Sequence, residues 1–163
     1  MRTRLAWPII AGLLLGNGSV QALTTTTTFQ AKVVIAATCV IGGATTLDFG
    51  TQGFLTANVE PTSTIQVQCT NTTPYNVGLD KGANGSSVTT RLMKGGPSNE
   101  TISYSIYSDS GRTTNWGNTV ATDTVSQTGN SSTQSFTVYG RIPPQTTPSP
   151  GTYTDTITVT VTY

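Results

Sequence analysis

Apolar and polar residues alternate along most of this chain, a period of two that is typical of β-strands and not of helices. The first such segment, residues 24–37, places four apolar side chains on one face of an extended strand: Phe29, Ala31, Val33 and Ile35. Five threonines precede them, and β-branched residues favour extended backbone. No hairpin turn follows directly. The pattern predicts an N-terminal strand that pairs either with its own sheet or with the sheet of another molecule.

The body of the chain shows the same alternation, which predicts an all-β domain. Between residues 63 and 70, Ile65, Val67 and Cys69 share one face and polar residues occupy the other. The other expected strands are 39–50, broken by Gly42 and Gly43, then 75–79, 88–93, 101–108, 119–125 and 136–141. After residue 22 no segment shows a helical period of useful length. Short strands separated by turns favour a sandwich of the immunoglobulin type.

The C-terminal segment is the most regular part of the sequence. After a proline-rich crossing at residues 143–150, we expect one long strand over residues 152–163. Its apolar face carries Tyr153, Ile157, Val159, Val161 and Tyr163, and Asp155 interrupts that face. Threonines occupy the opposite face. The sequence therefore predicts that the chain ends inside a strand.

The first 22 residues have the composition of a secretory signal peptide. Arg2 and Arg4 form a basic start, residues 5–15 form an apolar run, and Val20-Gln21-Ala22 offers a small-residue cleavage site. The apolar run is too short to span a bilayer of about 30 Å, which disfavours a transmembrane anchor. We expect cleavage after Ala22, no membrane span afterwards, and a single domain in the 141 residues that remain of 163.

Composition argues against several classes of function. Without Arg2 and Arg4 the 8 basic residues fall to 6, against 7 acidic ones, so the chain lacks the positive charge that attracts nucleic acid or an anionic membrane. It has no histidine to act as a base, no G-x-S-x-G motif, and carboxylates that are well separated in sequence. We therefore predict that the protein is not an enzyme, needs no cofactor and has no nucleic-acid partner.

Cys39 and Cys69 are the only cysteines of the chain. An even number in an exported protein predicts a disulfide, and Cys69, on the inner face of its strand, can reach Cys39 on the neighbouring one. Closing a loop of about 30 residues stabilises a fold by about 3 to 4 kcal/mol on the chain-entropy model. Two thiolates without any histidine do not complete a tetrahedral zinc site, so no metal is expected.

The order of these features resembles the spore coat protein U domain family, whose members include subunits of archaic chaperone-usher pili. The resemblance covers essentially the whole mature chain and rests on an ordered set of segments. The set comprises the N-terminal strand, Cys39 after a small-residue link, L-D-F-G at 47–50, Cys69 at the end of its strand, Y-S-I-Y-S-D at 104–109, F-T-V-Y-G-R-I-P at 136–143, and G-T-Y-T-D at 151–155 ahead of a terminal T-V-T-V-T-Y.

The resemblance implies an incomplete immunoglobulin-like sandwich that lacks its last strand and carries an N-terminal donor strand. Residues 1–22 are then the signal peptide, 23–37 the donor-strand extension and 38–163 the pilin domain. A periplasmic chaperone first fills the groove of such a subunit, and the donor strand of the next identical or related subunit replaces it, with an outer-membrane usher completing assembly. The donor residues are then Phe29, Ala31, Val33 and Ile35, and the groove is lined by Ile157, Val159, Val161 and Tyr163 of the C-terminal strand.

The function implied by the resemblance is that of a structural pilus subunit. Such a protein is exported through the periplasm to the cell surface, where its fibres serve adhesion and biofilm formation. The alternative is a secreted immunoglobulin-like binding or coat protein, in which residues 29–35 complete the sandwich of their own chain. For Tyr163, a core aromatic and a chaperone-anchored terminus are both compatible with the sequence.

Overall fold

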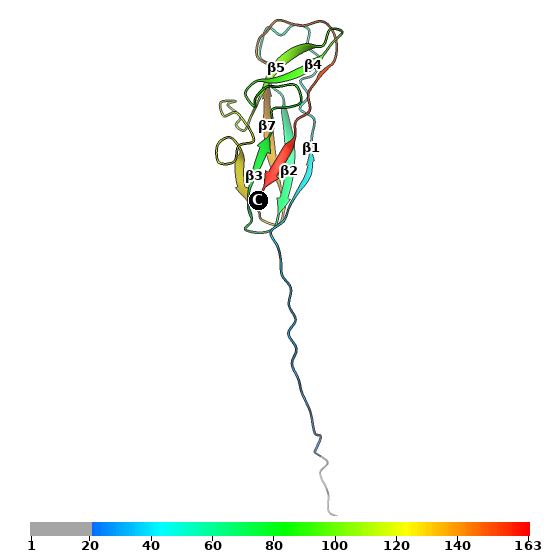
Figure 1. The fold of residues 1–163 in the computed structure, drawn as a ribbon, viewed down its shortest axis with the longest axis vertical. Coiled ribbons are helices and arrows are strands. Elements are labelled where there is room, and N and C mark those ends of the chain that lie inside the picture. Colours follow the sequence, from blue (N-terminus) through cyan, green and yellow to red (C-terminus); the bar gives the residue numbers. More distant parts are fainter. Residues whose placement is uncertain (1–20) are drawn as a thin grey trace, which may run out of the picture. The chain divides into compact units, whose positions relative to one another are not determined.

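A computed structural model describes residues 21–163, so the predicted signal peptide lies almost wholly outside the described residues. The chain divides into two units, one up to Val34 and one from Ile35 to Tyr163. Residues 21–34 contain no strand, whereas the second unit is a β-domain (Figure 1). Residues 21–163 contain no helix that is long and apolar enough to cross a membrane.

Nine strands form the β-domain within the described part of the chain. They are β1 (Cys39–Ala44), β2 (Thr62–Cys69), β3 (Pro74–Leu79), β4 (Arg91–Gly95), β5 (Glu100–Tyr107), β6 (Val125–Thr128), β7 (Thr133–Arg141), β8 (Tyr153–Thr154) and β9 (Val159–Thr162). One sheet has six strands in the order β1-β2-β7-β5-β4-β8, and the other has three in the order β6-β3-β9. All of these strand pairs are antiparallel. The predicted all-β fold class is confirmed.

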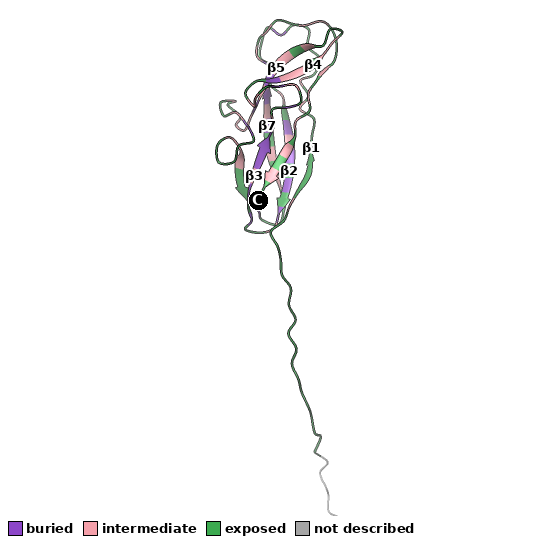
Figure 2. Cartoon of the chain, in the orientation of Figure 1, coloured by how far each residue is buried: buried purple, intermediate pink, exposed green. Residues whose placement is uncertain are grey.

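A single core cluster joins the inward faces of the two sheets. In β2, buried Ile65, Val67 and Cys69 alternate with more exposed polar residues, as the sequence predicts (Figure 2). The other core side chains are Leu55, Tyr75, Val77, Leu79, Tyr104, Ile106, Trp116, Val138 and Ile142. The core is therefore assembled mainly from β2, β3, β5 and β7, each of which has a strand partner on both sides.

The single long strand predicted for residues 152–163 is wrong, because this segment divides between the two sheets. Tyr153 and Thr154 form β8 and pair with β4, whereas Val159–Thr162 form β9 and pair with β3. Residues 155–158 between them belong to neither strand. The predicted faces are nevertheless retained, since half-buried and exposed residues alternate without a break from Tyr153 to Val161.

The strand expected over residues 119–125 is also wrong, because most of that segment is a turn and β6 begins only at Val125. The backbone N–H of Asp123 donates to the carbonyl of Thr119 at 3.1 Å. In return the carboxylate of Asp123 accepts a hydrogen bond from the N–H of Thr119 at 2.7 Å. Local hydrogen bonds that an Asp side chain accepts from the backbone compete with the hydrogen bonds of strand pairing.

Arg91 starts β4, within the segment 88–93 where a strand was expected, and it is a buried charge that the sequence analysis did not identify. Its side chain is 0 % exposed. It donates four hydrogen bonds at 2.7 to 3.0 Å, all to backbone carbonyls: those of Leu79, Asp80, Val88 and Trp116. The indole N–H of buried Trp116 donates in turn to the carbonyl of Val77 at 2.8 Å. These bonds join the loops that follow β3 and β5 to the start of β4.

Candidate functional site

Two neighbouring edge strands form the candidate functional site. β1 ends the six-stranded sheet and β9 ends the three-stranded sheet, so within the described residues each has a strand partner on one side only. The two strands lie close together although they belong to different sheets (Figure 1). Each edge therefore presents backbone N–H and C=O groups that can accept a further strand.

The inner face of β1 is incompletely covered. Cys39 and Ile41 lie opposite Cys69 and Val67 of β2, so they share the inward face of the sheet. Val67 is 0 % exposed, yet Ile41 beside it is 45 % exposed. Inward positions of a sandwich are normally covered by the facing sheet and by the next strand. Ile41 is therefore an inward position of β1 that the described residues leave partly uncovered.

The inner face of β9 shows the same deficit. Val159 lies opposite Leu79 of β3, and Val161 lies opposite Val77. The two β3 side chains are buried, at 1 % and 0 % exposed, whereas the two valines of β9 are only half-buried, as is Ile157 just before the strand. We define the open edge as the four incompletely covered side chains on the inner faces of the two strands: Ile41, Ile157, Val159 and Val161.

The predicted donor residues belong to a segment, residues 21–38, that forms no strand. Phe29 is 92 %, Val33 81 % and Ile35 77 % exposed, and Ala31 is exposed as well. Three of the four predicted groove residues lie in the open edge. The fourth, Tyr163, is 59 % exposed and is not part of the core formed by the described residues. Ile41 of the open edge was not predicted, although it follows Cys39 with the spacing of a shared face.

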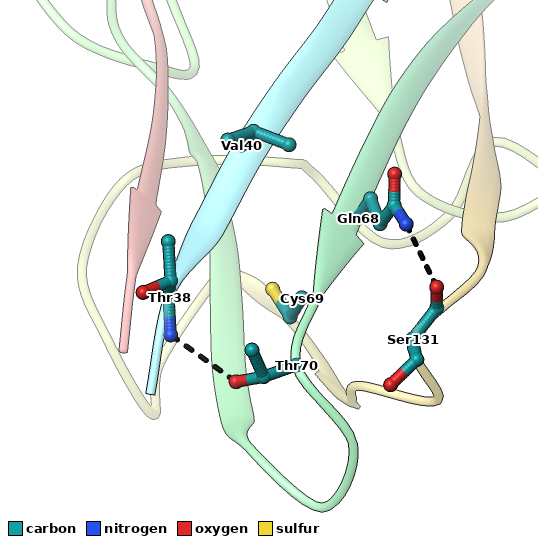
Figure 3. Close-up of a pocket in the computed structure, with 6 residues that line it drawn as sticks. All are labelled: Thr38, Val40, Gln68, Cys69, Thr70 and Ser131. Carbon is teal, nitrogen blue, oxygen red and sulfur yellow. Dashed lines mark hydrogen bonds between the residues drawn. The ribbon is translucent and has the colours of Figure 1, made fainter. Parts of the chain in front are cut away.

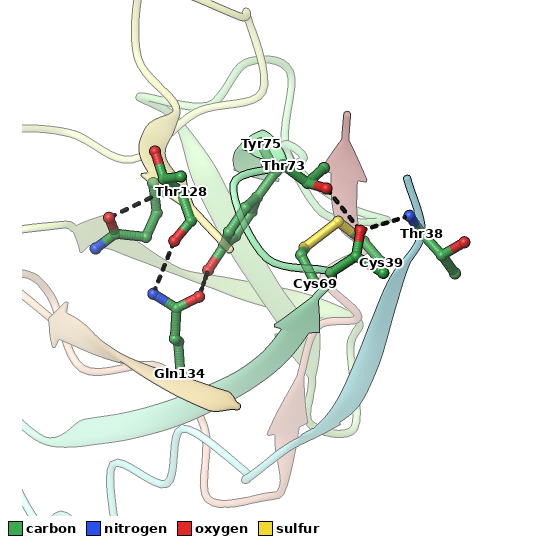
Figure 4. The surroundings of a disulfide bond; sticks show 9 residues. Thr38, Cys39, Cys69, Thr73, Tyr75, Thr128 and Gln134 are labelled. Atoms are coloured by element: carbon green, nitrogen blue, oxygen red, sulfur yellow. Dashed lines mark hydrogen bonds between the residues drawn. A yellow bond between two sulfur atoms is a disulfide. The ribbon is translucent and has the colours of Figure 1, made fainter. Parts of the chain in front are cut away.

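A disulfide attaches the start of β1 to the end of β2. The predicted bond between Cys39 and Cys69 is formed, which confirms that expectation. Next to this disulfide (Figure 4), the N–H of Thr70 donates to the carbonyl of Thr38 at 2.9 Å. The N–H of Thr38 donates to the hydroxyl of Thr70 at 3.1 Å (Figure 3). That hydroxyl also bonds the hydroxyl of Thr73 at 2.6 Å. The point at which the chain enters β1 is thus held by one covalent bond and several hydrogen bonds.

A shallow hollow of about 210 Å³ lies beside this anchor (Figure 3). It is lined by Thr38, Val40, Gln68, Cys69, Thr70 and Ser131, none of which is charged. The amide of Gln68 already donates to the carbonyl of Ser131 at 2.7 Å. None of the four side chains of the open edge lines this hollow, so the two are separate. It offers no group that distinguishes it as a ligand site.

The start of β9 is held by Asp80, in the loop that follows β3. The carboxylate of Asp80 accepts a hydrogen bond from the N–H of Thr158 at 2.9 Å, and the N–H of Asp80 donates to the carbonyl of Thr158 at 3.1 Å. The N–H of Gly82 donates to the same carboxylate at 3.0 Å. Burial alone would raise the pKa of Asp80, but the hydrogen bonds from Thr158 and Gly82 and the charge of Arg91 lower that pKa below its ordinary value.

Acidification is expected to destabilise the domain in a defined pH window. A carboxyl with a lowered folded-state pKa stabilises the fold above its unfolded pKa, about 3.9 for Asp, and this contribution is lost as the pH falls through the folded-state value. We expect the urea concentration at the midpoint of unfolding of the mature protein to decrease when the pH is lowered below about 4. The decrease is expected to be smaller in Asp80→Asn. The fluorescence of buried Trp116, the only tryptophan after residue 22, reports unfolding. Equal acid losses in both proteins would contradict the role of Asp80.

Comparisons with known proteins found a matching family model and similar proteins. Residues 25–160 match the model of the Spore Coat Protein U domain, a range that includes residues 29–35 and all of the open edge except Val161. Protein U of Myxococcus xanthus is 32 % identical over 178 residues, which cover 100 % of this chain and 98 % of that protein.

A solved structure shares the fold. It is a chain in the CsuC-CsuE chaperone-tip adhesion subunit pre-assembly complex from the archaic chaperone-usher Csu pili of Acinetobacter baumannii. The likeness has a TM-score of 0.57 and 26 % sequence identity, and it covers 79 % of this chain and 40 % of that one. The present chain therefore corresponds to less than half of the length of that neighbour.

Proposed function

Because this chain belongs to the Spore Coat Protein U domain family, a family of structural pilus and coat subunits, we propose that it is a pilus subunit that polymerises by donor-strand complementation. In this proposal, residues 29–35 of one copy add a strand between β1 and β9 of another. The chain is exported through the periplasm, held there by a chaperone, and assembled at an outer-membrane usher. The resulting surface fibre serves adhesion and biofilm formation.

The observation that carries the proposal is that an incompletely covered edge of the core and an exposed apolar segment occur in the same chain. The open edge leaves Ile41 at 45 % exposure in the interior face of a sandwich. The N-terminal segment has an alternating apolar face of which Phe29 is 92 % and Val33 81 % exposed. Each is an unfavourable exposure of apolar surface that the other can cover.

The energy of such a contact is large enough to hold a fibre together. Burying Phe29, Val33 and Ile35 at about 1.5 to 3 kcal/mol each, with less for Ala31, gives about 5 to 9 kcal/mol before ordering costs. Main-chain hydrogen bonds along both edges add to this value. Because every joint completes a hydrophobic core, the fibre persists kinetically without a covalent link between its subunits.

A chaperone is the second partner in the proposal. An isolated subunit exposes both strand edges, and exposed edges with apolar faces aggregate. The terminal strand β9 has no charged residue that would block such pairing. The structural neighbour from Acinetobacter baumannii is a chain of a complex between a chaperone and a pilus subunit, which supports a chaperone as the partner that covers the edges before assembly.

Deletion of residues 29–35 tests the proposed function. The full chain is secreted into the periplasm together with its chaperone and run on denaturing gels with and without boiling. We expect the wild type to give a ladder of multimers that collapses on heating, because each joint is a folded core. The deletion variant is expected to give only monomer and chaperone-bound monomer.

The matched control replaces the five threonines 24–28 by serine, which keeps the length and the apolar face. This variant is expected to retain the ladder. A normal ladder from the deletion variant would overturn the proposal. A wild type that is a stable, chaperone-free monomer would instead favour a secreted coat or binding protein that is complete by itself.

A further inference from the structure

The chain that leads into β9 has a continuous inward face, and one of its residues is charged. From Tyr153 to Val161 every odd-numbered residue is half-buried and every even-numbered residue is exposed. The odd positions are Tyr153, Asp155, Ile157, Val159 and Val161. Asp155 therefore borders the apolar part of this face, Ile157 to Val161, next to Ile157.

The carboxylate of Asp155 is held in place by two other parts of the domain, β5 and the loop after β3, and by the backbone of the next residue. One oxygen accepts a hydrogen bond from the hydroxyl of Tyr104 at 2.8 Å. The other accepts from the N–H of Ala83 at 2.9 Å, from the side-chain amide of Asn84 at 3.1 Å and from the N–H of Thr156 at 2.9 Å. With so many donors the carboxylate cannot turn aside to make room for an apolar side chain.

The loop around this carboxylate is adapted to it. Gly82 has φ of +79°, a conformation that other residues rarely adopt, and a Cβ atom at this position would collide with the carboxylate of Asp155. The same loop holds Thr158 through Asp80. Asp155 is therefore a rigid charged boundary at one end of the open edge.

The donor face and the β9 face match in length. Antiparallel pairing is the more stable arrangement, and in it the numbers of opposite residues have a constant sum. With a sum of 192, four pairs of apolar residues lie opposite one another: Phe29 with Tyr163, Ala31 with Val161, Val33 with Val159 and Ile35 with Ile157. This register places the small Ala37 opposite Asp155, and it gives exposed Tyr163 an aromatic partner.

Given donor-strand complementation, on which this inference rests, we propose that Asp155 sets the register in which the incoming strand of a second copy of this chain pairs with β9. A shift of one residue would turn the whole apolar face outward. If the numbers of opposite residues sum to 190, the apolar face still points inward, but Ile35 lies opposite the fixed carboxylate of Asp155. If they sum to 194, Phe29 no longer lies opposite Tyr163, and Ile157 lies opposite the small Ala37.

Engineered cysteines on the outward face report the register without disturbing the core. Three exposed residues are suitable: Lys32, Thr158 and Thr160. Residues 32 and 160 lie opposite one another in the proposed register, in which the numbers sum to 192. Residues 32 and 158 lie opposite one another in the shifted register, in which they sum to 190. Lys32→Cys is combined with Thr160→Cys in one chain and with Thr158→Cys in another. The multimers are oxidised, boiled and run without reductant. We expect a covalent ladder from the first pair and at least a tenfold weaker one from the second.

The role of Asp155 is tested by repeating both pairs with Asp155→Val, and with Asp155→Asn in case the valine variant does not fold. We expect the ladder of the 32/158 pair to rise several-fold in the absence of the charge, and that of the 32/160 pair to fall. An unchanged preference for the 32/160 pair in the folded variants would overturn the role of Asp155. A dominant 32/158 ladder with aspartate present would overturn the register itself.

Failure of the proposed function gives a different result from failure of this inference. The unboiled samples show whether multimers form at all, independently of any covalent bond. If no multimers form, donor-strand complementation is wrong and this inference fails with it. If heat-sensitive multimers form and neither cysteine pair is linked, the fibre joint exists and the register proposed here is wrong.

Discussion

Val33→Asp is expected to abolish multimers of the mature protein while leaving the folded β-domain intact. Val33 lies in the centre of the apolar face of residues 29–35, and in the proposed joint it is buried against β9. The substitution removes a buried apolar side chain and places a carboxylate in a core, which together cost about 4 kcal/mol or more. That is a loss of about a thousandfold in affinity for each joint.

Lys32→Asp is the matched control for this prediction. It introduces the same side chain one residue away, but on the face that the alternation directs to solvent. We expect this variant to form the heat-sensitive ladder at nearly the level of the wild type, and Val33→Asp to form none. Loss of multimers in both variants would point to a charge effect and not to burial of one face. Retention in both would contradict the donor role of residues 29–35.

Arg91→Met is expected to lower the free energy of unfolding by about 4 kcal/mol. Arg91 is 0 % exposed and donates hydrogen bonds to four backbone carbonyls. Methionine fills much of the same volume but donates no hydrogen bond, so these buried carbonyls each lose the hydrogen bond that they accept from Arg91. Burial lowers the pKa of Arg91, and the native hydrogen bonds compensate the cost of burying its charge.

The measurement for this prediction is urea unfolding followed by the fluorescence of Trp116, whose backbone carbonyl is one of the four acceptors. Lys94→Met, on the same strand but exposed, is the control and is expected to change stability by less than about 0.5 kcal/mol. A change in Arg91→Met no larger than that of the control would show that the four hydrogen bonds contribute little to the stability of the fold. Arg91→Lys is also expected to be destabilising, because an ammonium group cannot reach four carbonyls arranged around a planar guanidinium.

The parts of the fold that the sequence predicted are those governed by local alternation. β2 and the inner positions of β3, β5 and β7 follow a period of two, since each side chain of a strand points opposite to the one before it. The Cys39–Cys69 disulfide followed from two cysteines at the ends of adjacent strands. The alternating face of residues 29–35 was equally visible in the sequence, although its role as a donor strand is still a prediction.

The open edge was predicted only in part. Ile157, Val159 and Val161 were identified from their spacing, whereas Ile41 was missed because the glycines after it weakened the pattern of that strand. Asp155 was read as an interruption of an apolar face. Apart from the N–H of Thr156, its hydrogen-bond donors are more than 50 positions away, such as Tyr104, and no local pattern indicates such partners.

The sequence by itself determined which residues of a strand share a face, because side chains alternate along an extended chain, and the apolar residues indicated which face points inward. It also determined the fold class, the disulfide and an apolar N-terminal face that no hairpin turn directly follows. The tertiary structure alone decided that residues 153–162 divide between two sheets and that β1 and β9 are adjacent edges. Strand pairing and burial depend on residues that are distant in the chain, so the incomplete cover of the open edge becomes visible only when both sheets are in place.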